Sequence, residues 1–195
     1  MIHVRVGYAG GTGTSPTYYD LGGHAETVQI NYDPELVSYE ELLRVFWDSH
    51  GPPTIPLPSQ YRSVVFYHDD EQHKLALAYK AHLEVELGRT VVTEIVPFSR
   101  FHLAEDYHQK YYLRQVPELL GEFRTMYPEV SDFASSTAAA RINGFLGGHG
   151  TLQALEQQLP FFGLSPGTSS RLLEIGSRIL PVVDESTGAS CPVKG

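Results

Sequence analysis

The sequence predicts an α+β fold in which helices cover one face of a sheet. Its first half shows the order strand, strand, helix, strand, helix, strand, and only helices follow. This segregation of strands from later helices is typical of α+β proteins. A length of 195 residues fits one domain, or one domain with an extension, and a hydrophobic content of 42% is enough for a core.

The first two strands follow from alternating hydrophobicity. Apolar residues alternate with others over residues 2–6 and again over residues 28–32. Each alternation predicts a half-buried strand. Between them, Gly10, Gly11 and Gly13 predict a loop that tolerates unusual backbone angles.

Capping residues predict the first two helices. Ser38 and Glu41 have the spacing of a capping box, and Gly51-Pro52-Pro53 ends the helix that they begin. Asp69 caps the second helix, and Gly88 is placed to end it. The apolar positions expected to face the core are Leu42, Leu43, Val45 and Phe46 in the first helix and Leu75, Ala78, Tyr79 and Leu83 in the second.

The remaining elements are strands over 63–67 and 91–96 and helices over 104–113, 131–142, 151–159 and 170–180. Because the composition changes after Pro128, we expect a main domain over residues 1–127 and a helical extension over 128–183. Residues 184–195 are small and polar, which predicts a mobile tail.

The composition excludes several classes of partner. A net charge of -9 argues against nucleic acid, whose binding requires clustered Lys and Arg. The sequence contains no apolar stretch of about 18 residues, so no membrane span is expected. The single cysteine excludes an intrachain disulfide and fits a reducing compartment, so we expect a cytoplasmic protein. No cofactor is expected.

Several short motifs follow one another in the chain. They are Val6-Gly7-Tyr8-Ala9-Gly10-Gly11, Pro16-Thr17-Tyr18, Gly23-His24-Ala25-Glu26, Gln60-Tyr61-Arg62-Ser63 and Ala104-Glu105-Asp106-Tyr107-His108-Gln109. Through these motifs, roughly residues 4–115 resemble the A-type peptide methionine sulfoxide reductases. The resemblance implies a ferredoxin-like-derived mixed sheet with packed helices, here with a helical C-terminal extension. It also implies reduction of free or peptidyl methionine-S-sulfoxide, with thioredoxin restoring the oxidised enzyme.

The resemblance implies a role for each residue of a sulfoxide site. Glu26 matches the acid that protonates the sulfoxide oxygen, and Tyr18 and Tyr61 match the hydroxyl donors to that oxygen. His108 and Tyr111 match supporting positions near the substrate. General acid catalysis contributes roughly 10²–10⁴-fold to a rate, and an apolar pocket helps a carboxylic acid to keep its proton. We expect His24 to hold the turn and to take no part in the chemistry.

The thiol that the reaction needs is not found where the resemblance places it. In the family, a thiolate attacks the sulfoxide sulfur, becomes a sulfenic acid and is then resolved by a second thiol. The family's nucleophile lies in a Gly-Cys-Phe-Trp motif before the glycine turn, and this sequence has no such motif. Its only thiol is Cys191, either an unactivated tail cysteine or a resolving thiol. We therefore expect this chain to lack the first strand and helix of the family and to be inactive.

Two alternatives stay open. The chain could bind methionine sulfoxide peptides without reducing them, or it could be a fragment of a longer active enzyme whose open strand edges pair with another chain. Glu105 and His108 also have the spacing of a di-iron ligand pair. Because no further carboxylate pair accompanies them, no metal site is expected.

Overall fold

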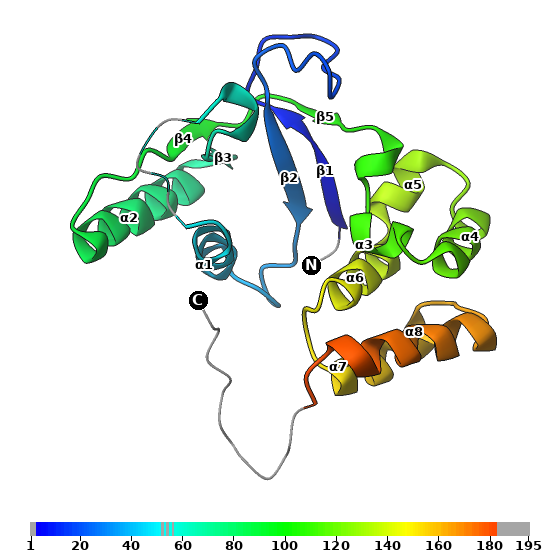
Figure 1. Cartoon of the computed structure of the whole chain (residues 1–195). Coiled ribbons are helices and arrows are strands. Elements are labelled where there is room, and N and C mark those ends of the chain that lie inside the picture. Colours follow the sequence, from blue (N-terminus) through cyan, green and yellow to red (C-terminus); the bar gives the residue numbers. More distant parts are fainter. Residues whose placement is uncertain (1–2, 52, 54, 56, 183–195) are drawn as a thin grey trace. The chain divides into compact units, whose positions relative to one another are not determined.

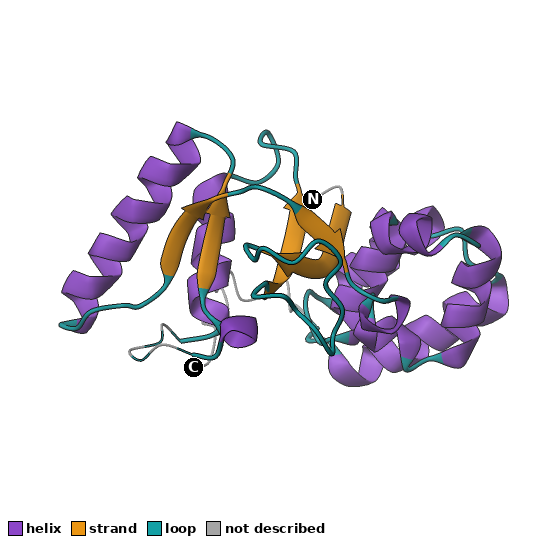
Figure 2. Cartoon of the chain, turned by 90° about the horizontal axis from the view of Figure 1, so that it is seen from above, coloured by secondary structure: helices purple, strands orange, loops and turns teal. Residues whose placement is uncertain are grey.

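The computed structural model describes residues 3–51, 53, 55 and 57–182 of the chain. It confirms the α+β class, with small sheets and eight α-helices among the described residues (Figures 1 and 2). The chain divides into two compact units, Met1–Gln109 and Lys110–Gly195. The contacts thus group residues 110–127 with the later helices, whereas the domain boundary after residue 127 stays a prediction.

The first unit contains an antiparallel sheet of three strands in the order β2-β1-β5. The strands are β1 (His3–Ala9), β2 (Ala25–Asn31) and β5 (Phe101–Leu103). In this register Tyr8 lies opposite Glu26 on one side and His102 on the other. Residues opposite one another in a ladder direct their side chains to the same face, so Tyr8 and Glu26 share a face of the sheet.

A second sheet of the same unit pairs β3 (Val64–Tyr67) with β4 (Glu94–Pro97) in parallel. Parallel neighbours require a long crossover, and here α2 (Asp70–Leu87) provides it. Helix α1 (Tyr39–Ser49) packs with α2 and β3 around one apolar core. The buried members of that core are Leu43, Trp47, Val65, Ala76 and Val91.

The predicted helix caps of this unit are confirmed. The Ser38 side chain accepts a hydrogen bond from the Glu41 backbone N–H, and Glu41 accepts one from the Ser38 N–H, which completes the capping box. Asp69 accepts a hydrogen bond from the Gln72 N–H. Gly88 ends α2 with a left-handed φ of 61°, a conformation that glycine adopts without steric cost.

The predicted inner faces of the two helices are only partly right. Val45 is 61% exposed and Ala78 is exposed, whereas Trp47 and Ala76 are buried. Residues four apart share a helix face, so the inner face of α1 is centred on Leu43 and Trp47. Val45 falls outside that face.

The described residues of the second unit, 110–182, contain helices and no strand. The helices are α3 (Tyr111–Arg114), α4 (Pro117–Met126), α5 (Val130–Ser135), α6 (Thr137–Leu146), α7 (Leu152–Gln158), the 3-10 helix η3 (Leu159–Phe161) and α8 (Pro166–Ile179). Their shared core includes Leu113, Phe123, Phe133, Ile142 and Leu172, all fully buried. Asn143 accepts hydrogen bonds from the backbone N–H groups of Tyr112 and Leu113, which fixes the start of α3 against α6.

Two sequence-based predictions of elements are wrong, and two elements were not predicted. Residues 104–113 do not form one helix: the 3-10 helix η2 (Asp106–His108) is separated from α3 by Lys110, whose φ of 54° interrupts a helix. The expected helix over 131–142 is split at Ser136, which caps α6 through the Ala139 N–H. Strand β5 and helix α4 were not expected. The predicted tail and Cys191 lie outside the described residues.

No helix in the described part of the chain is both long and apolar enough to cross a membrane.

Candidate functional site

The loop between β1 and β2 begins with a glycine turn that no larger residue fits. Gly10 has a φ of 79°, and a Cβ atom there would lie 2.6 Å from the Arg62 guanidinium and 2.7 Å from the Phe66 ring. Arg62 Nη2 donates a hydrogen bond of 3.0 Å to the Gly10 carbonyl. The turn therefore brings the backbone of the loop against the segment that carries Tyr61.

His24 holds the base of this loop, as the sequence predicts. The Gly11 N–H donates to His24 Nδ1 at 3.1 Å, and His24 Nε2 lies 2.9 Å from the Gly13 carbonyl oxygen. Because an N–H can only donate and a carbonyl can only accept, the ring is neutral and carries its proton on Nε2. The side chain is only 2% exposed, so both ring nitrogens serve to fix the loop.

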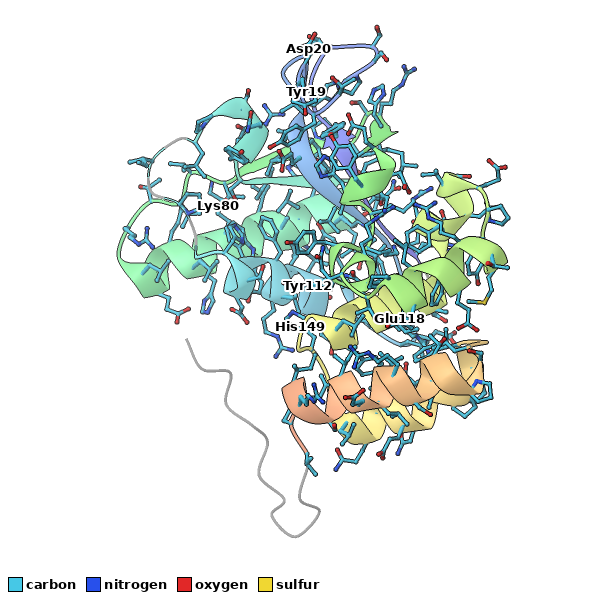
Figure 3. All side chains as sticks on the ribbon, turned by 45° about the vertical axis from the view of Figure 1, so that its right-hand side comes forward. Tyr19, Asp20, Lys80, Tyr112, Glu118 and His149 are labelled. Carbon is cyan, nitrogen blue, oxygen red and sulfur yellow. The ribbon has the colours of Figure 1, made fainter. Side chains whose placement is uncertain are left out.

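The tip of the loop carries Tyr18. Figure 3 shows the neighbouring Tyr19 and Asp20 at the outer end of the loop, where Tyr19 is 91% exposed. The backbone N–H of Tyr18 donates a hydrogen bond of 2.9 Å to Glu105 Oε1. The Tyr18 ring lies 5.1 Å from the ring of His108, between centroids. The tip is thus attached to the segment that follows β5.

Glu105 accepts a second hydrogen bond with its other oxygen. The Tyr8 hydroxyl donates to Glu105 Oε2 at 2.7 Å, and His108 Nε2 lies 3.8 Å from the same oxygen. Burial favours the neutral carboxyl, but the hydrogen bonds from Tyr8 and from the Tyr18 backbone outweigh it and lower the pKa of Glu105. Burial, together with the Glu105 carboxylate, raises the pKa of the Tyr8 phenol. Glu105 is therefore the carboxylate of a tyrosine-rich cluster.

The lowered pKa of Glu105 gives a testable pH dependence. A carboxyl with a lower pKa in the folded chain stabilises the fold above its unfolded pKa, and this stabilisation is lost as the pH falls through the folded pKa. We expect the Glu105 carboxyl carbon to titrate by NMR with a midpoint below that of an unperturbed glutamate, because its pKa is lowered. Tyr8→Phe removes one donor and should move the midpoint upwards. A midpoint at or above that of an unperturbed glutamate in the unmodified chain would contradict this reading.

Gln109 fixes the segment that carries Glu105 and His108. Its amide pairs with the backbone of Val6 in both directions: the Val6 N–H donates to Oε1 at 3.2 Å, and Nε2 donates to the Val6 carbonyl at 2.9 Å. Nε2 also donates to the Ala104 carbonyl at 3.1 Å. Because Gln109 is only 1% exposed, it acts as a buried extension of the strand pairing.

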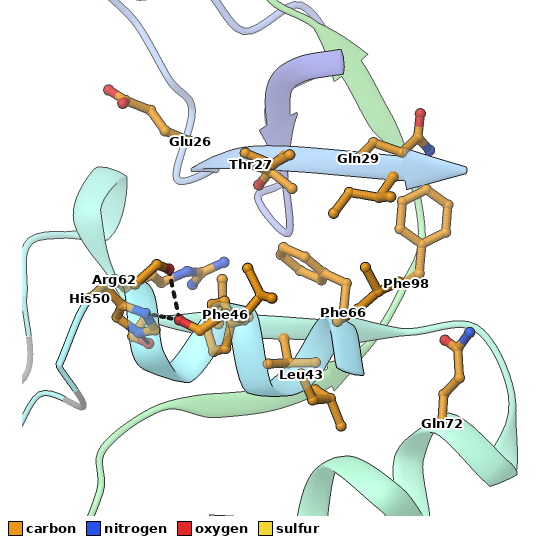
Figure 4. A pocket seen from close by; sticks show the side chains of 18 of the residues that line it. Glu26, Thr27, Gln29, Leu43, Phe46, His50, Arg62, Phe66, Gln72 and Phe98 are labelled. Carbon is orange, nitrogen blue, oxygen red and sulfur yellow. Dashed lines mark hydrogen bonds between the residues drawn. The ribbon is translucent and has the colours of Figure 1, made fainter. Parts of the chain in front are cut away.

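A pocket of about 700 Å³ lies beside β2 and includes two of the predicted site residues, Glu26 and Tyr61. Figure 4 shows α1 with Leu43 and Phe46 on one side of this pocket and β2 on the other. Glu26 extends from the end of β2 away from the pocket interior and is exposed (Figure 4). Val28 and Ile30 of β2 also line the pocket and are 58% and 37% exposed. The pocket is thus lined largely by apolar side chains.

Tyr61 lies on the 3-10 helix η1 (Ser59–Tyr61), and the next residue positions this helix. Arg62 donates to the Gly10 carbonyl and lies 3.8 Å from Glu94 of β4. Tyr61 itself is 54% exposed. Its phenol is therefore available to a ligand.

The structure places the predicted site residues in two neighbouring groups of the first unit. Glu26 and Tyr61 line the pocket, whereas Tyr18 and His108 lie around Glu105. Tyr8 connects the groups, since it lies opposite Glu26 in the sheet and donates to Glu105. Tyr111 belongs to the second unit, at the first position of α3. Its role, like those of the other site residues, stays a prediction.

Sequence reasoning missed the roles of Tyr8 and Glu105. The available signal was the spacing of Glu105 and His108, which suggested a metal ligand pair. Among the described residues, no group of three His, Cys, Asp or Glu side chains could hold a metal ion. The spacing instead reflects a carboxylate that accepts hydrogen bonds from tyrosines.

The fold and the pocket define an α+β protein with a site sized for a small ligand or a peptide side chain. Residues 1–137 match the family described as Peptide methionine sulfoxide reductase. The chain belongs to this family.

Known relatives agree with this assignment. A peptide methionine sulfoxide reductase of Drosophila melanogaster is 37% identical over 170 residues, which cover 85% of this chain and 67% of the relative. Peptide methionine sulfoxide reductase MsrA of Methanosarcina mazei is 49% identical over 123 residues, 57% of this chain and 58% of the relative. The chain thus spans between about half and two thirds of the length of these two relatives.

Solved structures of the family have a similar fold. Mxr1 from Saccharomyces cerevisiae in reduced form is similar with a TM-score of 0.51 and 29% identity, over 58% of this chain and 71% of that one. Methionine sulfoxide reductase A of Corynebacterium diphtheriae gives a TM-score of 0.50 and 28% identity, over 59% of this chain and 64% of that one.

Proposed function

We propose that this chain binds methionine-S-sulfoxide, free or within a peptide, and does not reduce it by itself. The observation that carries the proposal is the position of Tyr61 on a largely apolar pocket, at whose edge Glu26 lies with its side chain directed outward. A sulfoxide needs donors for its oxygen and apolar surface for its methyl group. Tyr61 offers a hydroxyl, and Glu26 offers a carboxyl that donates only when protonated.

The size of the pocket favours a sulfoxide within a peptide. A volume of about 700 Å³ lies in the range of about 300–1,000 Å³ that holds whole small ligands, and one methionine side chain fills only part of it. The exposed apolar side chains of Val28 and Ile30 supply surface for flanking residues. The proposed substrate is therefore methionine sulfoxide in an extended, apolar segment.

The number of thiols limits the chemistry. Reduction leaves the attacking cysteine as a sulfenic acid, and a second thiol must then form a disulfide with it. This sequence contains one cysteine, Cys191, so a sulfenic acid there would depend on an external thiol such as thioredoxin. A cytoplasmic location, which the single cysteine favours, would supply such a thiol.

Calorimetry with methionine-S-sulfoxide tests the binding proposal. We expect Tyr61→Phe to weaken binding by about 3- to 10-fold, the cost of one hydrogen bond. Glu26→Ala should weaken binding only in a buffer acidic enough to protonate carboxyl groups, because an ionised carboxylate cannot donate to the sulfoxide oxygen. Tyr19→Phe is the matched control, because Tyr19 is 91% exposed beside the site. The R epimer should bind less tightly than the S epimer. Equal affinity of the unmodified chain and both site variants would refute the site.

A turnover assay with dithiothreitol tests the second half of the proposal. We expect no reduction above the rate without protein, in the unmodified chain and in Cys191→Ser alike. Turnover that disappears in Cys191→Ser would make the tail cysteine the nucleophile. Turnover that persists in the variant would show a mechanism without a thiol of this chain, and either result overturns the proposal.

A further inference from the structure

Tyr18 lies in a loop whose base and tip are held by different groups. At the base, the N–H groups of Thr12 and Gly13 donate to the Gly22 carbonyl, and His24 bonds to Gly11 and Gly13. At the tip, the backbones of Thr17 and Asp20 bond to each other. The Thr17 hydroxyl also accepts from the Asp20 N–H, and Asp20 Oδ1 accepts from the Gly22 N–H. The bond from the Tyr18 N–H to Glu105 joins this tip to a residue 87 positions away.

The Glu105 carboxylate is itself fixed from two sides. Strand β5, which ends two residues earlier, pairs with β1, and the buried Gln109 amide attaches the following turn to Val6. Tyr8, only 2% exposed, donates from β1 to Oε2. The remaining oxygen, Oε1, is then directed at the loop. A carboxylate held in this way is a rigid acceptor, and hydrogen bonds to charged acceptors are stronger than those between neutral groups.

We propose that Glu105 is a positioning residue of the sulfoxide site: by joining the Tyr8 hydroxyl to the Tyr18 backbone N–H, it holds the Tyr18 phenol against His108 on the side of the sheet that carries Glu26. The proposal rests on the proposed function, because the role assigned to Glu105 is to position Tyr18 for the proposed sulfoxide site. It assigns Glu105 no contact with the ligand.

The register of β1 and β2 places the residues of the proposal on one face of the sheet. Tyr8 and Glu26 are opposite residues in the register of β1 and β2 and therefore point to the same face. Because Glu105 bonds to the end of the Tyr8 side chain, the Tyr18 backbone lies at that face as well. The Tyr18 ring packs against His108, 5.1 Å between centroids, which sets the direction of its hydroxyl.

The hydrogen bond from the Tyr18 N–H to Glu105 is called the anchor. Hydrogen exchange of the Tyr18 amide, followed by NMR in the full chain without ligand, tests this anchor directly. We expect Glu105→Ala to accelerate this exchange by about 10- to 100-fold, because the amide loses a charged acceptor. Glu105→Gln keeps one carbonyl oxygen and should accelerate it less, which is the conservative rescue. Tyr8→Phe should have a smaller effect of the same sign. Glu156→Ala, at an exposed position of α7, and Tyr127→Phe are the matched controls.

Binding measurements separate positioning from general stabilisation. Glu105→Ala should weaken methionine-S-sulfoxide binding by about 3- to 10-fold. In the double variant with Tyr8→Phe, the loss of binding free energy should be smaller than the sum of the two single losses, because both changes interrupt the same hydrogen-bonded link between Tyr8 and Tyr18. Exchange of the Val4 and Val28 amides should not change. If Glu105→Ala does not fold, the exchange rate in Glu105→Gln decides.

The outcomes for the anchor and for the site are distinguishable. Unchanged Tyr18 exchange in a folded Glu105 variant overturns the positioning role, whether or not sulfoxide binds. Faster Tyr18 exchange with unchanged affinity also overturns it, since the anchor would then serve the loop alone. If the unmodified chain binds no sulfoxide, the proposed function fails even where the exchange result reveals the anchor.

Discussion

Replacing His24 by alanine is expected to lower the free energy of unfolding of the first unit by about 3 kcal/mol, from the loss of a buried side chain and two hydrogen bonds. His24 is 2% exposed. Its removal leaves the Gly11 N–H and the Gly13 carbonyl without the ring nitrogens that they bond to. The ring also contacts His102 of β5, 5.1 Å between centroids, so the pairing of β5 should weaken too.

Urea unfolding followed by tryptophan fluorescence measures this effect. The chain contains one tryptophan, Trp47, which is buried in the core of the first unit, so its fluorescence reports on that unit. His82→Ala is the matched control: His82 is exposed on α2 and lies 4.0 Å from Glu86, and its loss should cost less than about 0.5 kcal/mol.

A second variant distinguishes loss of the hydrogen bonds from loss of volume. His24→Asn keeps an oxygen that can accept the Gly11 N–H, so it should retain part of the stability that His24→Ala loses. Equal midpoints for the unmodified chain and His24→Ala would mean that the glycine turn holds itself, and the structural role of His24 would then be wrong.

Local chemistry made much of the first unit predictable. The Ser38–Glu41 capping box, the Asp69 cap and the Gly88 end all depend on residues within a few positions of one another. These caps appear in the sequence because the interacting groups are neighbours in the chain. The role expected for His24 came from the motif around it, since its partners Gly11 and Gly13 lie 13 and 11 residues away.

The features that were missed depend on distant partners. Strand β5 has only three residues, and it exists because it pairs with β1. Glu105 meets Tyr8 across 97 residues, and no periodicity or spacing indicates such a contact. Likewise, Lys110 interrupts the predicted helix with a left-handed φ, and its Nζ donates to the Ala134 carbonyl. Tertiary contacts of this kind override local preference.

The motif resemblance predicts candidate site residues, but it does not predict how the structure groups them. The motif resemblance singled out Glu26, Tyr18 and Tyr61, and the structure places all three in the first unit. Only the structure assigns Glu26 and Tyr61 to the pocket and Tyr18 to Glu105. The exposed position of Glu26 could not be read from its motif, because burial depends on what packs against β2.

The open edge of β2 is expected to make the chain associate as the concentration rises. Within the described residues β2 is the outer strand of its sheet, and β3 pairs with β4 alone. Val28 and Ile30, which the alternation predicted to be half-buried, are instead 58% and 37% exposed. An exposed strand edge with apolar side chains is a template for pairing with another chain, and the available partner in a pure sample is β2 of a second copy.

Sedimentation measures this association against a monomer mass of 21.7 kDa. The apparent mass of the unmodified chain should rise towards that of a dimer over a range from about 10 µM to 1 mM, which corresponds to association free energies from about -7 to -4 kcal/mol. Val28→Lys places a charge on the edge and should return the chain to the monomer mass. Val85→Lys is the matched control, because Val85 is 82% exposed on α2 and its charge should leave association unchanged. If the unmodified chain keeps the monomer mass at every concentration, or if Val85→Lys dissociates it as well as Val28→Lys does, pairing through β2 is excluded.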